Sequence, residues 1–90
     1  MTRRLANMVA FARFCQCYEI DPVVAAALIQ AAARAFRLGE YNCNKPGFES
    51  RLKAAQLHVE ELAIAVGFTV SWPGLAPCLE RAGQTVNLPD

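Results

Sequence analysis

The chain has 90 residues, and we expect them to form a single domain over residues 1–90. Hydrophobic residues make up 54% of the sequence and charged residues only 19%, so there are more apolar side chains than a small core buries. This surplus favours a homo-oligomer or a protein partner. Nine Lys and Arg nearly balance eight Asp and Glu, and the net charge of +1 lacks the basic excess of typical nucleic-acid-binding domains, so nucleic acid is not the expected partner.

The compartment is predicted from the absence of targeting signals. No run reaches the roughly 18 to 20 apolar residues that span a bilayer, so no membrane segment is predicted. The apolar start of the chain is interrupted by Asn7 and Arg13, and no small-residue cleavage site follows it. We therefore expect a cytoplasmic protein with reduced thiols.

The first predicted element is a helix over residues 3–18. Thr2 precedes it as an N-cap, because its hydroxyl can accept a free backbone N–H of the first turn. An apolar stripe repeats at helical spacing and comprises Leu5, Met8, Ala12 and Cys15. Val9, Phe11 and Phe14 widen the apolar face beyond this stripe.

The second predicted helix covers residues 22–38. Asp21 is suited to its N-cap and proline to its first position, and Gly39 predicts a left-handed stop. Only Gln30 is polar before the arginines near its end, so the helix is apolar on all sides. We expect one face to pack on the first helix and the other on a second copy of the chain. The predicted self-association residues are Val24, Leu28 and Ile29.

A third helix is predicted over residues 47–66, after a loop at 40–47 and before a stop at Gly67. Leu57 and Ile64 lie off its main apolar seam and are expected to add a second contact. The seam itself is formed by Leu52, Ala55, Val59, Leu62 and Val66.

The remaining residues allow two interpretations. A helix-turn-helix over residues 59–82 would require a helix from about residue 71 to 82, but Pro77 would break it at a cost of roughly 3 kcal/mol. The favoured interpretation is an antiparallel β-meander over residues 68–88. It has a type II turn in which Gly74 supplies the positive φ, and a two-residue hairpin link at residues 82–83. The predicted fold class is therefore α+β, mostly helical, with a three-helix core and a C-terminal meander.

The segments "ELAIAVGF", "TVSWPGL" and "VNLP" resemble the tail of many small uncharacterised proteins encoded by phages and prophages. The resemblance covers about the last third of the chain, and its short motifs consist of turn and core residues. It implies an accessory protein acting in the cytoplasm of a bacterial host by binding a host protein or protein complex. Inhibitors of host defence, including anti-CRISPR proteins, are one such class. The resemblance transfers no site residues.

Residues capable of catalysis or metal binding do not form a recognisable motif. Cys15 and Cys17 would diverge on a helix, and Cys43 and Cys78 are solitary, so packing is the favoured role of all four thiols. His58, the only histidine, is expected on a helix surface, within reach of Cys78 only if the tail packs nearby. No metal, cofactor or enzymatic activity is predicted.

The candidate partner-binding residues are instead those that often dominate protein interfaces, Arg34, Phe36, Arg37 and Trp72. The two arginines equally suit the C-terminal end of a helix, and the tryptophan is also suited to the core. The predicted function is a non-enzymatic protein-binding module, in its narrowest form a phage-encoded inhibitor that blocks a host defence complex sterically. The alternatives are a helix-turn-helix regulator and a structural subunit of a phage or bacterial assembly.

Overall fold

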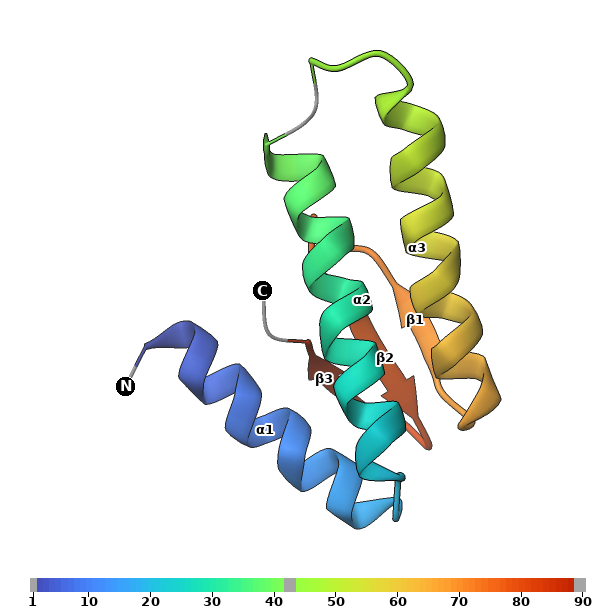
Figure 1. Ribbon diagram of the computed structural model, residues 1–90. Helices are drawn as coiled ribbons and strands as arrows, with labels where there is room; N and C mark the ends of the chain where they lie inside the picture. Colours follow the sequence, from blue (N-terminus) through green and yellow to red (C-terminus); the bar gives the residue numbers. More distant parts are fainter. Residues whose placement is uncertain (1, 42–43, 89–90) are drawn as a thin grey trace.

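The computed structural model describes residues 2–41 and 44–88. Three helices are followed by three strands, as the sequence predicts (Figure 1). The elements in chain order are α1 (Arg3–Cys17), α2 (Pro22–Tyr41), α3 (Phe48–Ala65), β1 (Thr69–Ser71), β2 (Cys78–Arg81) and β3 (Gln84–Asn87).

The helices and the sheet form two layers. In Figure 1, α2 and α3 run side by side as an antiparallel hairpin in front of the sheet, and α1 crosses at a steep angle beside β3. The main helix contact of α2 is with α3, and α1 packs chiefly on β3, so the expected packing of the second helix on the first is not its main contact. Side chains of α1 and α2 nevertheless share one core.

The sheet is an antiparallel meander in the order β1-β2-β3, which leaves β1 and β3 at its two edges. Val70 pairs with Leu79, which pairs with Val86, so these three side chains share the face turned toward the helices. Neighbouring residues on the opposite face, such as Thr69 and Glu80, are exposed. One face of the sheet therefore covers the core and the other is polar.

The predicted helix starts are confirmed. The Thr2 hydroxyl accepts the Leu5 N–H at 3.2 Å, and the Asp21 carboxylate accepts the Val23 N–H at 2.8 Å. The predicted stop at Gly67 is also confirmed, because its φ is 87° and the next N–H, of Phe68, donates to the Ala63 carbonyl at 2.9 Å. The chain therefore reverses sharply at the end of α3, and β1 returns beside it.

The predicted end of the second helix is wrong, because α2 continues through Gly39 to Tyr41. Gly39 has no positive φ and is not a stop. Its role is steric, since a Cβ at this position would lie 2.7 Å from the Leu75 Cδ2. The missing side chain lets the loop between β1 and β2 pack against the helix.

The predicted apolar face of the first helix is only partly buried. Leu5, Met8 and Ala12 are exposed, whereas Phe11 and Phe14 are buried beside Cys15. Because α1 rests on the sheet with a single narrow face, the larger aromatic side chains occupy the core. The seam of α3 is confirmed at its centre, where Ala55 and Val59 are buried.

An aromatic cluster joins α1, the end of α3 and the hairpin. The Phe14 ring centroid lies 5.0 Å from that of Tyr18 and 5.2 Å from that of Phe68. The Arg81 guanidinium stacks 4.5 Å above the Tyr18 ring and donates to the Val66 carbonyl at 3.1 Å. The Tyr18 hydroxyl lies 3.1 Å from the Arg81 carbonyl oxygen. This one arginine therefore satisfies a carbonyl at the end of α3 while holding α1 against β2.

The two predicted turns of the meander have different outcomes. Ala82 and Gly83 form the two-residue link between β2 and β3, with φ of 55° and 79°, as predicted. The type II turn is wrong, because Gly74 has no positive φ and residues 72–77 form a wider loop. Trp72 turns toward α3, and Pro77 is buried, so the loop is shaped by contacts with the helices.

We expect Ala82→Asn to raise the free energy of unfolding by about 1 kcal/mol, because asparagine tolerates the left-handed conformation in which the alanine Cβ is crowded. Gly83→Ala should lower it by a similar amount, because it places a Cβ at φ 79°. Urea denaturation of the three proteins checks both directions. Equal midpoints would contradict the hairpin geometry.

We expect Arg81→Ala to lower the free energy of unfolding by about 2 kcal/mol, through the loss of a charge-assisted hydrogen bond and the stacked cation. The matched control is Arg13→Ala, which removes an exposed arginine of α1 and should change stability by less than about 0.5 kcal/mol. Thermal and urea denaturation of both variants measure the difference. Similar values for the two would show that Arg81 does not join the elements.

Candidate binding groove between α3 and β1

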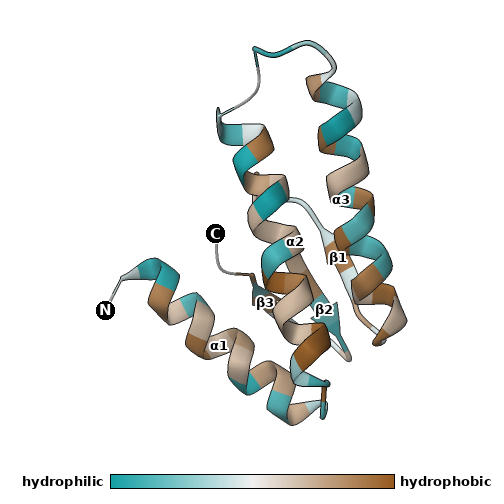
Figure 2. Ribbon diagram, viewed as in Figure 1, coloured by the Kyte–Doolittle hydropathy of each residue, from teal (hydrophilic) through white to brown (hydrophobic). Residues whose placement is uncertain are grey.

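Exposed apolar side chains gather on the outer side of α3, next to the edge strand. Leu57 is 54% exposed and Ile64 is 66% exposed, although both are large hydrophobic residues. They lie two helical turns apart and therefore on one side of the helix. In Figure 2, apolar positions recur along α3 and continue into β1. Both residues were expected to lie off the main apolar seam of the third helix. Only the tertiary structure places the edge strand β1 beside them.

Two adjoining hollows follow this side of α3. One, of about 290 Å³, is lined by Leu57, Glu60, Glu61, Ile64, Thr69 and Val70. The other, of about 430 Å³, is lined by Lys53, Ala54, Gln56, Leu57, Glu60 and Trp72. Both include Leu57 and Glu60, so they form one groove, which we call the α3–β1 groove. Its floor is mainly apolar and its rim is charged.

The backbone of β1 borders this groove with an unpaired edge. The Leu88 N–H donates to the Pro77 carbonyl at 3.1 Å, so residues 77 and 88 form a hydrogen-bonded pair beside the β2–β3 ladder. Because bonded pairs alternate along an antiparallel ladder, Cys78 and Glu80 direct their backbone groups toward β1. The backbone groups of Thr69 and Ser71 face β2 in turn, and the N–H and C=O of Val70 point outward. An extended segment could pair with that outward N–H and C=O.

Carboxylates give the rim of the groove its charge. The Glu60 Oε1 accepts a hydrogen bond from the Trp72 indole N–H at 3.2 Å, which fixes both side chains. Glu61 is exposed beside it, and Lys53 lines the far end of the groove. The centre of the groove is therefore negative above an apolar floor.

The structure does not bring the four predicted partner-binding residues together. Arg34 and Arg37 are exposed on α2, and Arg34 lines a separate hollow between α2 and α3. Phe36 lines yet another hollow, with Leu75 and residues of α1. Trp72 alone lies in the α3–β1 groove, half-buried and packed against the core.

The predicted self-association surface on α2 is not available as a unit. Leu28 has 0% exposure and lies at the centre of the core. Val24 and Ile29 are half-buried and pack against the same core. The reason is that α2 packs along α3 and shares one core with α1 and the sheet, so an apolar surface that was expected to meet a second copy is covered within the chain.

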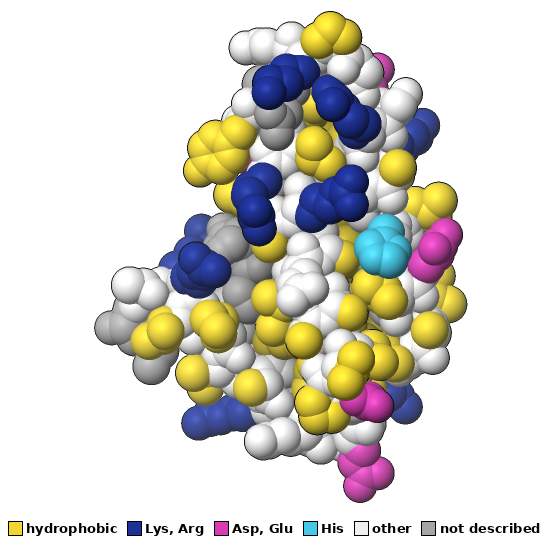
Figure 3. Space-filling model, in the orientation of Figure 1, with side chains coloured by type: hydrophobic (Ala, Val, Ile, Leu, Met, Phe, Trp, Pro, Cys, Tyr) yellow, Lys and Arg dark blue, Asp and Glu magenta, His cyan; other side chains and the backbone are white. Residues whose placement is uncertain are grey.

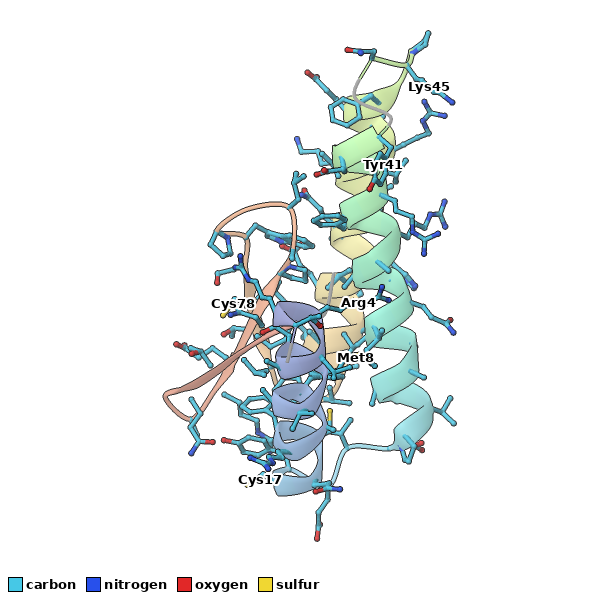
Figure 4. The ribbon with its side chains drawn as sticks, turned by 90° about the vertical axis from the view of Figure 1, so that its left-hand side faces the viewer. Arg4, Met8, Cys17, Tyr41, Lys45 and Cys78 are labelled. Atoms are coloured by element: carbon cyan, nitrogen blue, oxygen red, sulfur yellow. The ribbon has the colours of Figure 1, made fainter. Side chains whose placement is uncertain are left out.

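The three cysteines that the structure describes are free thiols in different surroundings. Figure 4 shows Cys17 near the end of α1 and Cys78 at the sheet, and Cys15 is buried in the core. Cys43 lies outside the described residues. Within residues 2–41 and 44–88, no group of three His, Cys, Asp or Glu residues is placed to hold a metal ion. His58 lines the hollow that contains Arg34, and Cys78 is not among the residues of that hollow.

Comparison of the chain with family models, curated proteins and solved structures finds no match. The resemblance to phage-encoded proteins therefore stays a prediction. The helix that the helix-turn-helix alternative requires is not present, because residues 78–81 form β2. None of the helices in the described part of the chain combines the length and apolar character needed to cross a membrane.

Burial raises the pKa of the Cys15 thiol. A raised pKa means a smaller thiolate fraction near neutral pH, so we expect iodoacetamide to modify the exposed Cys17 faster than Cys15. Site-resolved mass spectrometry at pH 7.5 measures both rates in one peptide. In 6 M guanidinium the two rates should converge, and equal rates in the folded protein would contradict the burial of Cys15.

Proposed function

We propose that this protein is a non-enzymatic protein-binding module whose α3–β1 groove receives an extended segment of a partner protein. The observation that carries the proposal is the exposure of Leu57 and Ile64 beside the outward N–H and C=O of Val70. A strand added to β1 would hydrogen-bond to that edge and direct alternate side chains toward the groove floor. Main-chain pairing and apolar burial would then act on the same segment.

Charge complementarity favours a partner segment that carries Lys or Arg. Glu60 lines both hollows and Glu61 lines one of them, so a basic side chain between two apolar ones would meet carboxylates at the centre of the groove. Pairing of β1 with β1 of a second copy would instead bring the Glu60 and Glu61 carboxylates of the two copies together near the two-fold axis of the dimer. We therefore favour a different protein as the occupant, with self-association as the competing outcome.

The narrower form of this proposal is the phage-encoded inhibitor of a host defence complex, for which steric blockade requires only a binding surface. The excess of apolar residues in a small, sparsely charged chain supports a binding role. A structural subunit of a larger assembly would use the same groove, and the identity of the bound protein distinguishes the two.

The proposal is tested by affinity capture from a bacterial lysate with the wild type, Leu57→Asp and Ile64→Asp. Each substitution places a charge on the groove floor, and we expect each to reduce the captured protein at least tenfold, because a buried unpaired carboxylate is costly. The matched control is Val23→Asp, which changes a 76% exposed apolar residue of α2 and should leave capture unchanged. Equal capture by all four proteins would overturn the groove as the binding site.

The role of the strand edge is tested separately with Val70→Pro. Proline lacks the outward N–H but is tolerated at an edge strand. We therefore expect the variant to fold but to capture no partner protein from the lysate. Circular dichroism checks its fold. Light scattering of the wild type at increasing concentration tests the competing outcome, since a dimer that Leu57→Asp converts to a monomer would assign the groove to self-association.

A further inference from the structure

A second surface, on the side of α3 that faces α2, has the opposite charge. Figure 3 shows Lys and Arg side chains gathered over the upper parts of α2 and α3, while the acidic side chains of this face lie mostly below or at its margin. Figure 4 shows Lys45 near the tip of the same helical hairpin. The small net charge of +1 therefore conceals a local excess of positive charge.

Within this basic surface lies a compact hollow between α2 and α3, of about 160 Å³. Two arginines and the only histidine line it, one from α2 and two from α3, and no Asp or Glu is among its lining residues. Its floor consists of alanines, whose small side chains leave the space open. The lining residues are Ala31, Arg34, Arg51, Ala54, Ala55 and His58.

Arg34 and Arg51 approach the hollow from different helices. Arg51 also donates to the Pro46 carbonyl at 2.8 Å, which tethers its guanidinium near the start of α3. His58 lies two turns further along α3 and contributes a ring nitrogen that can donate. The hollow is therefore bordered by side chains with hydrogen-bond donors at three positions, and its volume is that of a small group.

We infer that this hollow binds the phosphate group of a small phosphomonoester. Donors from three side chains on two helices suit the tetrahedral oxygens of a phosphate, whereas one arginine fork already satisfies a planar carboxylate. A phosphomonoester carries nearly two negative charges at neutral pH, so it gains more from two guanidinium groups than a singly charged diester does. The single compact hollow also favours one phosphate group over a long polyanion, which needs a series of contacts along its backbone.

The test is a titration of the ¹⁵N-labelled protein with inorganic phosphate and with glycerol phosphate, followed by NMR. Sodium chloride at matched ionic strength is the reference. We expect saturable shifts confined to the His58 imidazole and the backbone around Arg34 and Arg51. Arg34→Gln should weaken binding about tenfold, the order expected for the loss of a charge-assisted hydrogen bond.

The matched control is Arg4→Gln, which removes the same charge from an exposed position on α1 and should change the dissociation constant less than twofold. Arg51→Gln tests the second arginine, and circular dichroism checks that the loss of its bond to Pro46 leaves the helices intact. Non-saturating shifts equal to those in chloride, or equal weakening by Arg4→Gln, would overturn the site. Tighter competition by a DNA duplex at 150 mM salt than by glycerol phosphate would overturn the assignment to a small ligand.

Discussion

The sharp reversal between α3 and β1, clamped by Arg81, is the constraint on which the rest of the structure depends. Gly67 adopts the left-handed conformation that ends the helix, and Phe68 then enters the aromatic cluster with Phe14. Arg81 donates to the carbonyl that the helix end would otherwise leave unpaired. Because the same guanidinium stacks on Tyr18, one side chain fixes the positions of α1, α3 and β2.

This reversal also creates the α3–β1 groove. It brings β1 back along the outer side of α3, so that side chains off the main helical seam border a strand edge instead of open solvent. At the opposite edge of the sheet, α1 packs against β3. The two edges therefore have different surroundings, and only the β1 edge adjoins exposed Leu57 and Ile64. The proposed binding role of this edge depends on this asymmetry of the fold.

The two proposed sites use charge in opposite ways on opposite sides of α3. Carboxylates line the α3–β1 groove, whereas arginines line the hollow between α2 and α3. At physiological salt, fields of this kind decay over about 8 Å, so each site presents its own sign to an approaching ligand. A nearly neutral total charge is therefore compatible with two selective surfaces, because selectivity depends on local charge. The sites can be tested separately, since the variants proposed for one leave the lining of the other unchanged.

The sequence by itself determined most of the local structure. Thr2 and Asp21 marked the helix starts, Gly67 marked the end of α3, and the link at residues 82–83 was recognised from its position between two strands. These features depend on neighbouring residues, whose preferences act over a few positions in any fold. The fold class followed from them, and the proline near the end of the chain argued against the helix-turn-helix.

Only the tertiary structure decided which apolar surfaces are covered. The alanine-rich α2 was expected to need a second copy, but Leu28 is enclosed in a core shared by the other helices and the sheet. Gly39 was interpreted as a stop, although its role is to admit Leu75 from a distant loop. Arg34 was singled out beside Phe36, but it lines a hollow with Arg51 and His58 of another helix. Each of these outcomes depends on contacts between residues far apart in the chain, and periodicity along one helix does not contain that information.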